Sequence, residues 1–149
     1  MNYLVHTLEI VYITVLIDVL GGGYMELNIN SRDPVYLQVV RYFKEQIATG
    51  KLKAGEEIPS RRELAGLLKI NPNTAQKAYK EMEEQGLITT ERNFPSRITT
   101  DEVVLQSVRE ELISEAIDTF VSSIKVINVP VDELLQKVKE KYETENDNM

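Results

Sequence analysis

Apolar residues in the middle of the chain recur at the spacing of α-helices. A first helix is expected to begin at Asp33-Pro34, because Asp can cap a helix and Pro suits its first position, and to end at Gly50. Four positions at i, i+4, i+7 and i+11 form one apolar face of this helix: Tyr36, Val40, Phe43 and Ile47.

Two shorter helices are predicted next. The segment Ser60-Arg61-Arg62-Glu63 is a capping box, and the helix it begins is expected to end near Lys69. Asn71-Pro72 begins the following helix as cap and first residue, and Gly86 closes it. The apolar residues of the two helices are Leu64, Leu67 and Leu68, then Ala75, Ala78, Tyr79 and Met82.

Short β-rich runs surround these helices. Residues 51–59 contain helix breakers and predict a turn with a β-bridge around Ile58. Residues 87–90 and 97–99 predict two strands joined by a polar turn, although Pro95 weakens the second strand. The order of helix, short helix, three-residue turn, helix and hairpin is that of a winged helix-turn-helix.

We therefore expect a mainly α chain, with the winged helix-turn-helix running from about Asp33 to Ile98 within a domain of residues 25–99. Residues 100–149 predict a helical region with a polar tail. A long amphipathic helix is expected over Glu102 to Ile124, and Asp132 is expected to cap a last helix. The apolar stripe of the long helix comprises Leu105, Val108, Leu112, Ile117, Phe120, Val121 and Ile124.

The first 24 residues form an apolar extension with two open interpretations. The apolar run over residues 4–20 contains His6, Glu9 and Asp18, lacks flanking Lys or Arg, and is short for the roughly 20 residues of a membrane span. A secretory signal is not indicated, because there is no basic n-region. The segment is either a strand or helix that packs on the body, or a stretch upstream of the natural first residue, Met25. The second interpretation arises because glycine codons begin with GG, so the three glycines before this methionine can be a translated purine-rich ribosome-binding site.

Charge is distributed unevenly along the chain. The net charge is −7, yet residues 31–98 hold 12 Lys/Arg against 9 Asp/Glu, whereas residues 99–149 hold 5 against 12. The chain has no cysteine and one histidine, which leaves no thiolate metal site, thiol nucleophile or pair of imidazoles. We expect no enzymatic activity, metal or cofactor, and a reducing cytoplasmic location without membrane association.

Five short motifs lie in one order over residues 34–98. They are Pro34-Val35-Tyr36-x-Gln38, Gly50-Lys51-Leu52-x-x-Gly55, Pro59-Ser60-x-Arg62-Glu63-Leu64-Ala65, Asn71-Pro72-Asn73-Thr74-x-x-x-Ala78-Tyr79 and Gly86-Leu87-Ile88. In this order and spacing they resemble the GntR family of bacterial regulators. The Asn-Pro-Asn-Thr motif, with only about 50 residues after the hairpin, looks like the YtrA subfamily. That resemblance implies two C-terminal helices used for dimerisation and no large effector domain.

The resemblance places the third helix in the major groove of DNA, with its N-terminal residues at base edges. Candidate base contacts are Asn73, Thr74 and Gln76, with Lys77 and Lys80 further along the helix. Family position adds Arg62 and, at the tip of the wing, Arg92. Arg61 and Lys77 are candidate phosphate clamps, and Asn93 can take the positive φ that a wing glycine usually supplies.

Some of these polar residues also have simpler explanations. Asn71 is expected to act mainly as a helix cap, and Tyr36, Phe43 and Tyr79 as core residues rather than stacking platforms.

The expected function is that of a homodimeric transcription regulator, a repressor, that binds double-stranded operator DNA at a palindrome. The alternative is a winged-helix module that binds a protein partner. The C-terminal apolar stripe is expected to pair two copies, and its acidic surroundings to face away from DNA. A small-molecule effector is not identified, and one would have to bind at the dimer interface.

Overall fold

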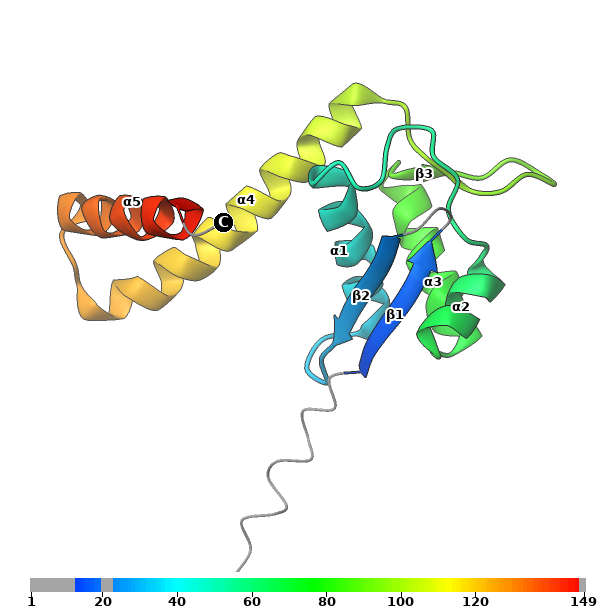
Figure 1. The fold of residues 1–149 in the computed structure, drawn as a ribbon, viewed down its shortest axis with the longest axis horizontal. Coiled ribbons are helices and arrows are strands. Elements are labelled where there is room, and N and C mark those ends of the chain that lie inside the picture. Colours follow the sequence, from blue (N-terminus) through cyan, green and yellow to red (C-terminus); the bar gives the residue numbers. More distant parts are fainter. Residues whose placement is uncertain (1–12, 20–22, 148–149) are drawn as a thin grey trace, which may run out of the picture. The chain divides into compact units, whose positions relative to one another are not determined.

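The computed structural model describes residues 13–19 and 23–147, and these divide into two units (Figure 1). The first unit extends to Glu110 and the second begins at Glu111, so the boundary lies inside the long helix α4 (Glu102–Ile124). This is later than the expected boundary near residue 100. The first turns of α4 belong to the body, since Val108 is only 1% exposed.

Helix α1 (Val35–Ala48) begins one residue later than expected. Pro34 is the capping residue and makes no side-chain cap, so the prediction that Asp33 caps and Pro34 is the first helical residue is wrong. The loop before α1 is instead held by Gln38, whose Nε2 donates to the carbonyls of Asn30 and Asp33 at 2.9 and 2.8 Å. These contacts, across eight and five residues, hold the loop against the first turns of α1.

The predicted starts of α2 (Arg61–Leu68) and α3 (Pro72–Glu84) are confirmed. The hydroxyl of Ser60 accepts from the backbone N–H of Glu63, whose carboxylate accepts from the backbone N–H of Ser60 at 2.8 Å. These reciprocal bonds satisfy two N–H groups that have no partner inside the helix. Helix α2 ends at Lys69, which takes the left-handed conformation. The turn to α3 is therefore short and sharply defined.

The wing is a small antiparallel sheet. Strands β3 (Ile88–Thr89) and β4 (Arg97–Ile98) have two residues each, and Ile88 pairs with Ile98. The segment before α2 extends this sheet, because Glu57 forms a β-bridge with Arg97 and the two side chains form an ion pair. The predicted hairpin and the bridge near Ile58 are confirmed. Backbone hydrogen bonds between residues 55–58 and the β4 side of the wing add to its two-residue ladder.

An antiparallel pair of strands precedes α1. Strand β1 (Ile13–Val19) pairs with β2 (Gly23–Ile29), and Met25 lies opposite Ile17. Strand β2 contacts α1 and β1 contacts α2, so the pair packs on the helical body (Figure 1). A packed strand is one of the two interpretations given above for this segment. A translational start at Met25 stays a prediction, and residues 1–12 lie outside the described residues.

The core of the first unit joins α1, α2, α3 and the wing. Phe43 and Tyr79 are buried as expected, whereas Tyr36 is only half-buried. The most deeply buried large side chains are Tyr79, Phe43, Met82, Leu87, Ile98, Val39 and Val108. This core fixes α3 against both α1 and the wing.

The second unit consists of the rest of α4, a 3-10 turn (Lys125–Ile127) and α5 (Val131–Asp147). Helix α5 begins at Val131, so Asp132 is its second residue and the prediction that Asp132 caps it is wrong. The carbonyl of Pro130 instead accepts from the N–H of Leu134 at 3.0 Å. In the described part of the chain, no helix is both long and apolar enough for a bilayer span.

Candidate nucleic-acid interface

The first turns of α3 present polar side chains to solvent. The Oδ1 of Asn71 accepts from the N–H of Asn73 at 2.8 Å, which occupies Asn71 as a cap. Asn73 and Gln76 are exposed and Thr74 is half-buried. Among the described residues, the side chains of these three have no hydrogen-bond partner. The amides of Asn73 and Gln76 are therefore available for an external partner.

Lys77 and Lys80 lie further along α3 and have neighbours of their own. The Nζ of Lys77 lies 3.9 Å from the ring centroid of Tyr36 on α1, a cation–π contact. Lys80 forms an i,i+4 ion pair of 3.6 Å with Glu84 in which both side chains are highly exposed. Such an exposed pair contributes little to stability, so Lys80 keeps its charge available. Tyr36 fixes the place of Lys77.

Arg61 and Arg62 are adjacent on α2 but have different surroundings. Arg62 is exposed and has no ion-pair partner within the described residues. Arg61 donates from Nη2 to the Oε1 of Glu83 at 2.7 Å, and its guanidinium lies 5.7 Å from the centre of the Tyr79 ring. Its Nε is buried and without a hydrogen-bond partner in the described part of the chain. Arg61 therefore has an internal structural role, which weighs against the expected phosphate clamp.

The wing tip carries an aromatic residue beside polar ones. Asn93 has a φ of 68°, so it occupies the left-handed conformation expected of it. The turn is closed by a bond from the N–H of Phe94 to the carbonyl of Glu91 at 3.1 Å. Arg92 and Asn93 are exposed, and Phe94 is 64% exposed. The tip thus presents one cation, one amide and one apolar ring.

Buried and capping groups stabilise the frame behind this surface. The Tyr79 hydroxyl donates to the carbonyl of Pro59, and burial raises the pKa of Tyr79 well above its ordinary value of 10.0. The hydrogen bonds from the hydroxyl and backbone of Ser60 hold the pKa of Glu63 below its ordinary range. Tyr79 is therefore a neutral donor and Glu63 an anion at neutral pH.

Sequence reasoning missed Glu83 and Gln38 as parts of this frame, and it named Tyr36 only as a core residue, without its contact with Lys77. Gln38 lies in the first of the five motifs, which indicates that the residue has a role. The motif does not indicate its hydrogen-bond partners. Glu83 lies 22 residues from Arg61, and no local pattern predicts a pair at that separation.

Comparisons with known proteins agree with this geometry. The sequence model described as "Bacterial regulatory proteins, gntR family" matches residues 35–98, which hold α1, α2, α3 and the wing. The regulator YhcF of Bacillus subtilis is 30% identical over 77% of this chain and 95% of its own length. The chain belongs to the GntR family of transcriptional regulators. Its DNA-binding element is the helix-turn-helix formed by α2 and α3.

Further relatives match about three quarters of this GntR regulator. The repressor YtrA of Bacillus subtilis is 32% identical over 78% of this chain and 90% of its own. A GntR regulator from Listeria monocytogenes has a TM-score of 0.70 and 30% identity, covering 75% of this chain and 98% of its own. A regulator from Oenococcus oeni has a TM-score of 0.64 and 36% identity, covering 76% and 95%. The predicted resemblance to GntR and YtrA-type regulators is confirmed, as is the mainly α winged fold with C-terminal helices.

Proposed function

We propose that this GntR regulator is a repressor that binds a palindromic operator as a homodimer. The observation that carries the proposal is the exposed row of polar side chains on α3, beside an unpaired Arg62 on α2. In a helix-turn-helix the second helix enters the major groove with its N-terminal residues at base edges. The proposal assigns that role to α3.

The residues of this surface have distinct roles in the proposal. Asn73 and Gln76 can each pair bidentately with adenine, and the Thr74 methyl can meet a thymine methyl. Arg62 can pair with guanine or with the backbone. Lys77 and Lys80 contact phosphates, which position the protein without reading sequence. Arg92 and Asn93 contact DNA from the wing, while Arg61 supports the surface from behind.

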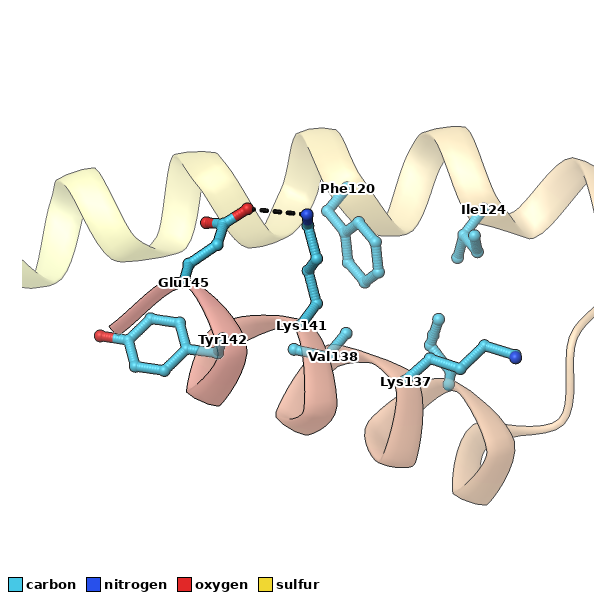
Figure 2. Close-up of a pocket in the computed structure, with 8 residues that line it drawn as sticks. Phe120, Ile124, Lys137, Val138, Lys141, Tyr142 and Glu145 are labelled. Carbon is cyan, nitrogen blue, oxygen red and sulfur yellow. Dashed lines mark ion pairs between the residues drawn. The ribbon is translucent and has the colours of Figure 1, made fainter. Parts of the chain in front are cut away.

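The second unit supports the homodimer in this proposal. Phe120 and Ile124 of α4 and Val138 of α5 line a largely apolar groove, with Tyr142 at one end and the ion pair of Lys141 with Glu145 beside it (Figure 2). Apolar side chains around this groove remain exposed to solvent, a pattern typical of interaction surfaces. They include Ile113, Ile117, Val121, Leu135 and Tyr142. A second copy would cover them.

Not every residue of the predicted dimer stripe is equally available to a partner. Ile117, Phe120 and Val121 are exposed, and Leu105, Leu112 and Ile124 are half-buried. Val108 already lies in the core of the first unit, so it can add little surface to a dimer. The proposal therefore places the interface on the C-terminal half of α4 and on α5. The role as a repressor is supported by kinship to YtrA, whose name states that activity.

Selection of bound sequences from a random pool of duplex DNA tests the function. The full chain is expected to enrich a palindrome with half-sites about 10 bp apart, or a multiple of that spacing. Its affinity is expected to fall as salt rises, because phosphate contacts release counterions. A chain with both Asn73 and Gln76 replaced by Ala is the control, and it should lose the selected motif while its circular dichroism is unchanged.

Two outcomes would contradict this function. A pool that yields no enriched sequence removes specific DNA binding. Salt-independent binding to a protein partner, without affinity for duplex DNA, supports the alternative of a protein-interaction module.

A further inference from the structure

One carboxylate joins three elements of the DNA-binding unit. Glu83, in the last turn of α3, accepts at Oε1 from the Nη2 of Arg61 at 2.7 Å and from the hydroxyl of Thr90 at 2.6 Å. The Thr90 hydroxyl also lies 2.7 Å from the hydroxyl of Ser96. Arg61 is the first residue of α2, while Thr90 and Ser96 lie on the two sides of the wing, after β3 and before β4.

These contacts differ from the other ion pairs of α3. The side chains of Arg61 and Glu83 are 37% and 32% exposed, and Arg61 also lies on the ring of the buried Tyr79. Within the part of the chain that the structure describes, the neighbouring Glu84 pairs only with Lys80, one turn earlier on the same helix, with both side chains highly exposed. Glu83 therefore links separate elements, whereas Glu84 links none.

The wing depends on such a link because its own ladder is short. Strands β3 and β4 have two residues each, and the tip between them contains no glycine. Residues 55–58 add backbone hydrogen bonds to the β4 side of the wing, and residues 91–95 at the tip lie outside this ladder. The hydrogen bonds of Thr90 with Glu83 and Ser96 fix the tip-side end of the ladder to the C-terminal end of α3.

We propose that Glu83 is a positioning residue for DNA binding, which sets the wing and the start of α2 in place relative to the recognition helix. The proposal rests on the proposed function, because it concerns the surface that carries Arg62 on α2 and Arg92 on the wing. Glu83 touches no DNA itself. Its charge orders Arg61, next to Arg62, and its second hydrogen bond orders the wing.

The first test compares Glu83→Gln with Glu84→Gln on the selected operator. Both variants remove one negative charge from adjacent positions of α3, but only the first weakens the hydrogen bonds to Arg61 and Thr90, because the neutral amide oxygen of Gln accepts less strongly than a carboxylate. We expect Glu83→Gln to weaken binding roughly tenfold, the scale of one lost contact. Hydroxyl-radical footprinting should show lost protection where the wing lies and retained protection in the major groove. Glu84→Gln should bind at or above the wild-type affinity, because it frees Lys80.

A double-mutant cycle separates positioning from general destabilisation. Thr90→Val removes the hydrogen bonds of the Thr90 hydroxyl with Glu83 and Ser96 and leaves the pair of Arg61 with Glu83 in place. This variant therefore tests the proposal even if Glu83→Gln fails to fold. In a chain that already carries Arg92→Ala, Thr90→Val is expected to have almost no further effect on affinity. Combined with Gln76→Ala, the same substitution should act additively.

The outcomes distinguish this inference from the function on which it rests. A wild-type chain that binds no operator overturns both. A wild-type chain with a footprint, whose Glu83→Gln and Thr90→Val variants match Glu84→Gln in affinity and wing protection, overturns only the role of Glu83. Additivity of Thr90→Val with Arg92→Ala also overturns it, because the wing would not then be the route of the effect.

Discussion

At the scale of single residues, neighbours with the same chemistry have different roles. Arg61 and Arg62 are adjacent, yet Arg61 is held between Glu83 and Tyr79 while Arg62 remains exposed. The 100° turn between consecutive helical residues turns one toward α3 and the other toward solvent. We therefore propose Arg62 as the arginine of α2 that contacts DNA.

Arg62→Ala is expected to weaken operator binding by ~1–3 kcal/mol, the range for loss of a base-contacting arginine. The circular dichroism spectrum should not change, because Arg62 makes no ion pair within the described residues. A gel-shift titration at fixed salt measures the affinity. Arg62→Lys is the matched control, and it should restore part of the affinity but not a bidentate guanine contact. Wild-type affinity for Arg62→Ala would remove this residue from the interface.

Glu63→Gln is expected to lower stability at neutral pH and to have less effect in acid. The hydroxyl and backbone of Ser60 lower the folded-state pKa of Glu63 below its ordinary value of 4.5. Its charge therefore stabilises the fold above that value, and this stabilisation is lost as pH falls through the lowered pKa. Urea unfolding of both proteins from pH 7 to pH 3 measures the difference. Parallel curves over the whole range would contradict the argument.

At the scale of elements, helix ends are set by local chemistry. The capping box at Ser60, the cap at Asn71 and the positive φ of 71° at Gly86 each satisfy or redirect the backbone at a helix end. Because these signals act within four residues, they predict where α2 and α3 begin and end. The start of α1 differs because Gln38, within the helix, contacts Asn30 and Asp33 before it.

Asn71→Ala is expected to destabilise the first unit by about 0.5–2 kcal/mol, the range for loss of an N-cap. The substitution removes the 2.8 Å bond to the N–H of Asn73. Asn71→Asp keeps an acceptor at the same place and should have nearly wild-type stability. Chemical denaturation of the three proteins measures the free energy of unfolding. Equal values for the Ala and Asp variants would show that the cap does not contribute.

At the scale of the whole molecule, the two units differ in surface chemistry. The segment 31–98 carries more Lys and Arg than Asp and Glu, whereas residues 99–149 are acidic. The second unit also exposes a series of apolar side chains on α4 and α5. The basic segment thus lies within the first unit, whereas the exposed apolar side chains of the C-terminal part of α4 and of α5 lie in the second, which supports the proposal that one binds DNA and the other self-associates.

Ile117→Asp is expected to convert the proposed homodimer into monomers and to weaken binding to the proposed palindrome. Ile117 is 53% exposed in the single chain, so a carboxylate there is tolerated in the monomer but would be buried in the dimer. Sedimentation equilibrium measures the mass, and Ser122→Asp, at another exposed position of α4, is the control that should remain dimeric. A dimeric Ile117→Asp chain would place the interface elsewhere.

The sequence by itself determined the order of elements, the ends of α2 and α3 and most core positions, because caps and periodic apolar residues act over one or two helical turns. It also placed Asn73, Gln76 and Arg62 on their helices. Only the tertiary structure decided which arginine of α2 turns inward and which acid receives it, since Arg61 and Glu83 are 22 residues apart and meet only when α2 packs on α3. Contacts at such separations depend on packing, and no local pattern encodes them.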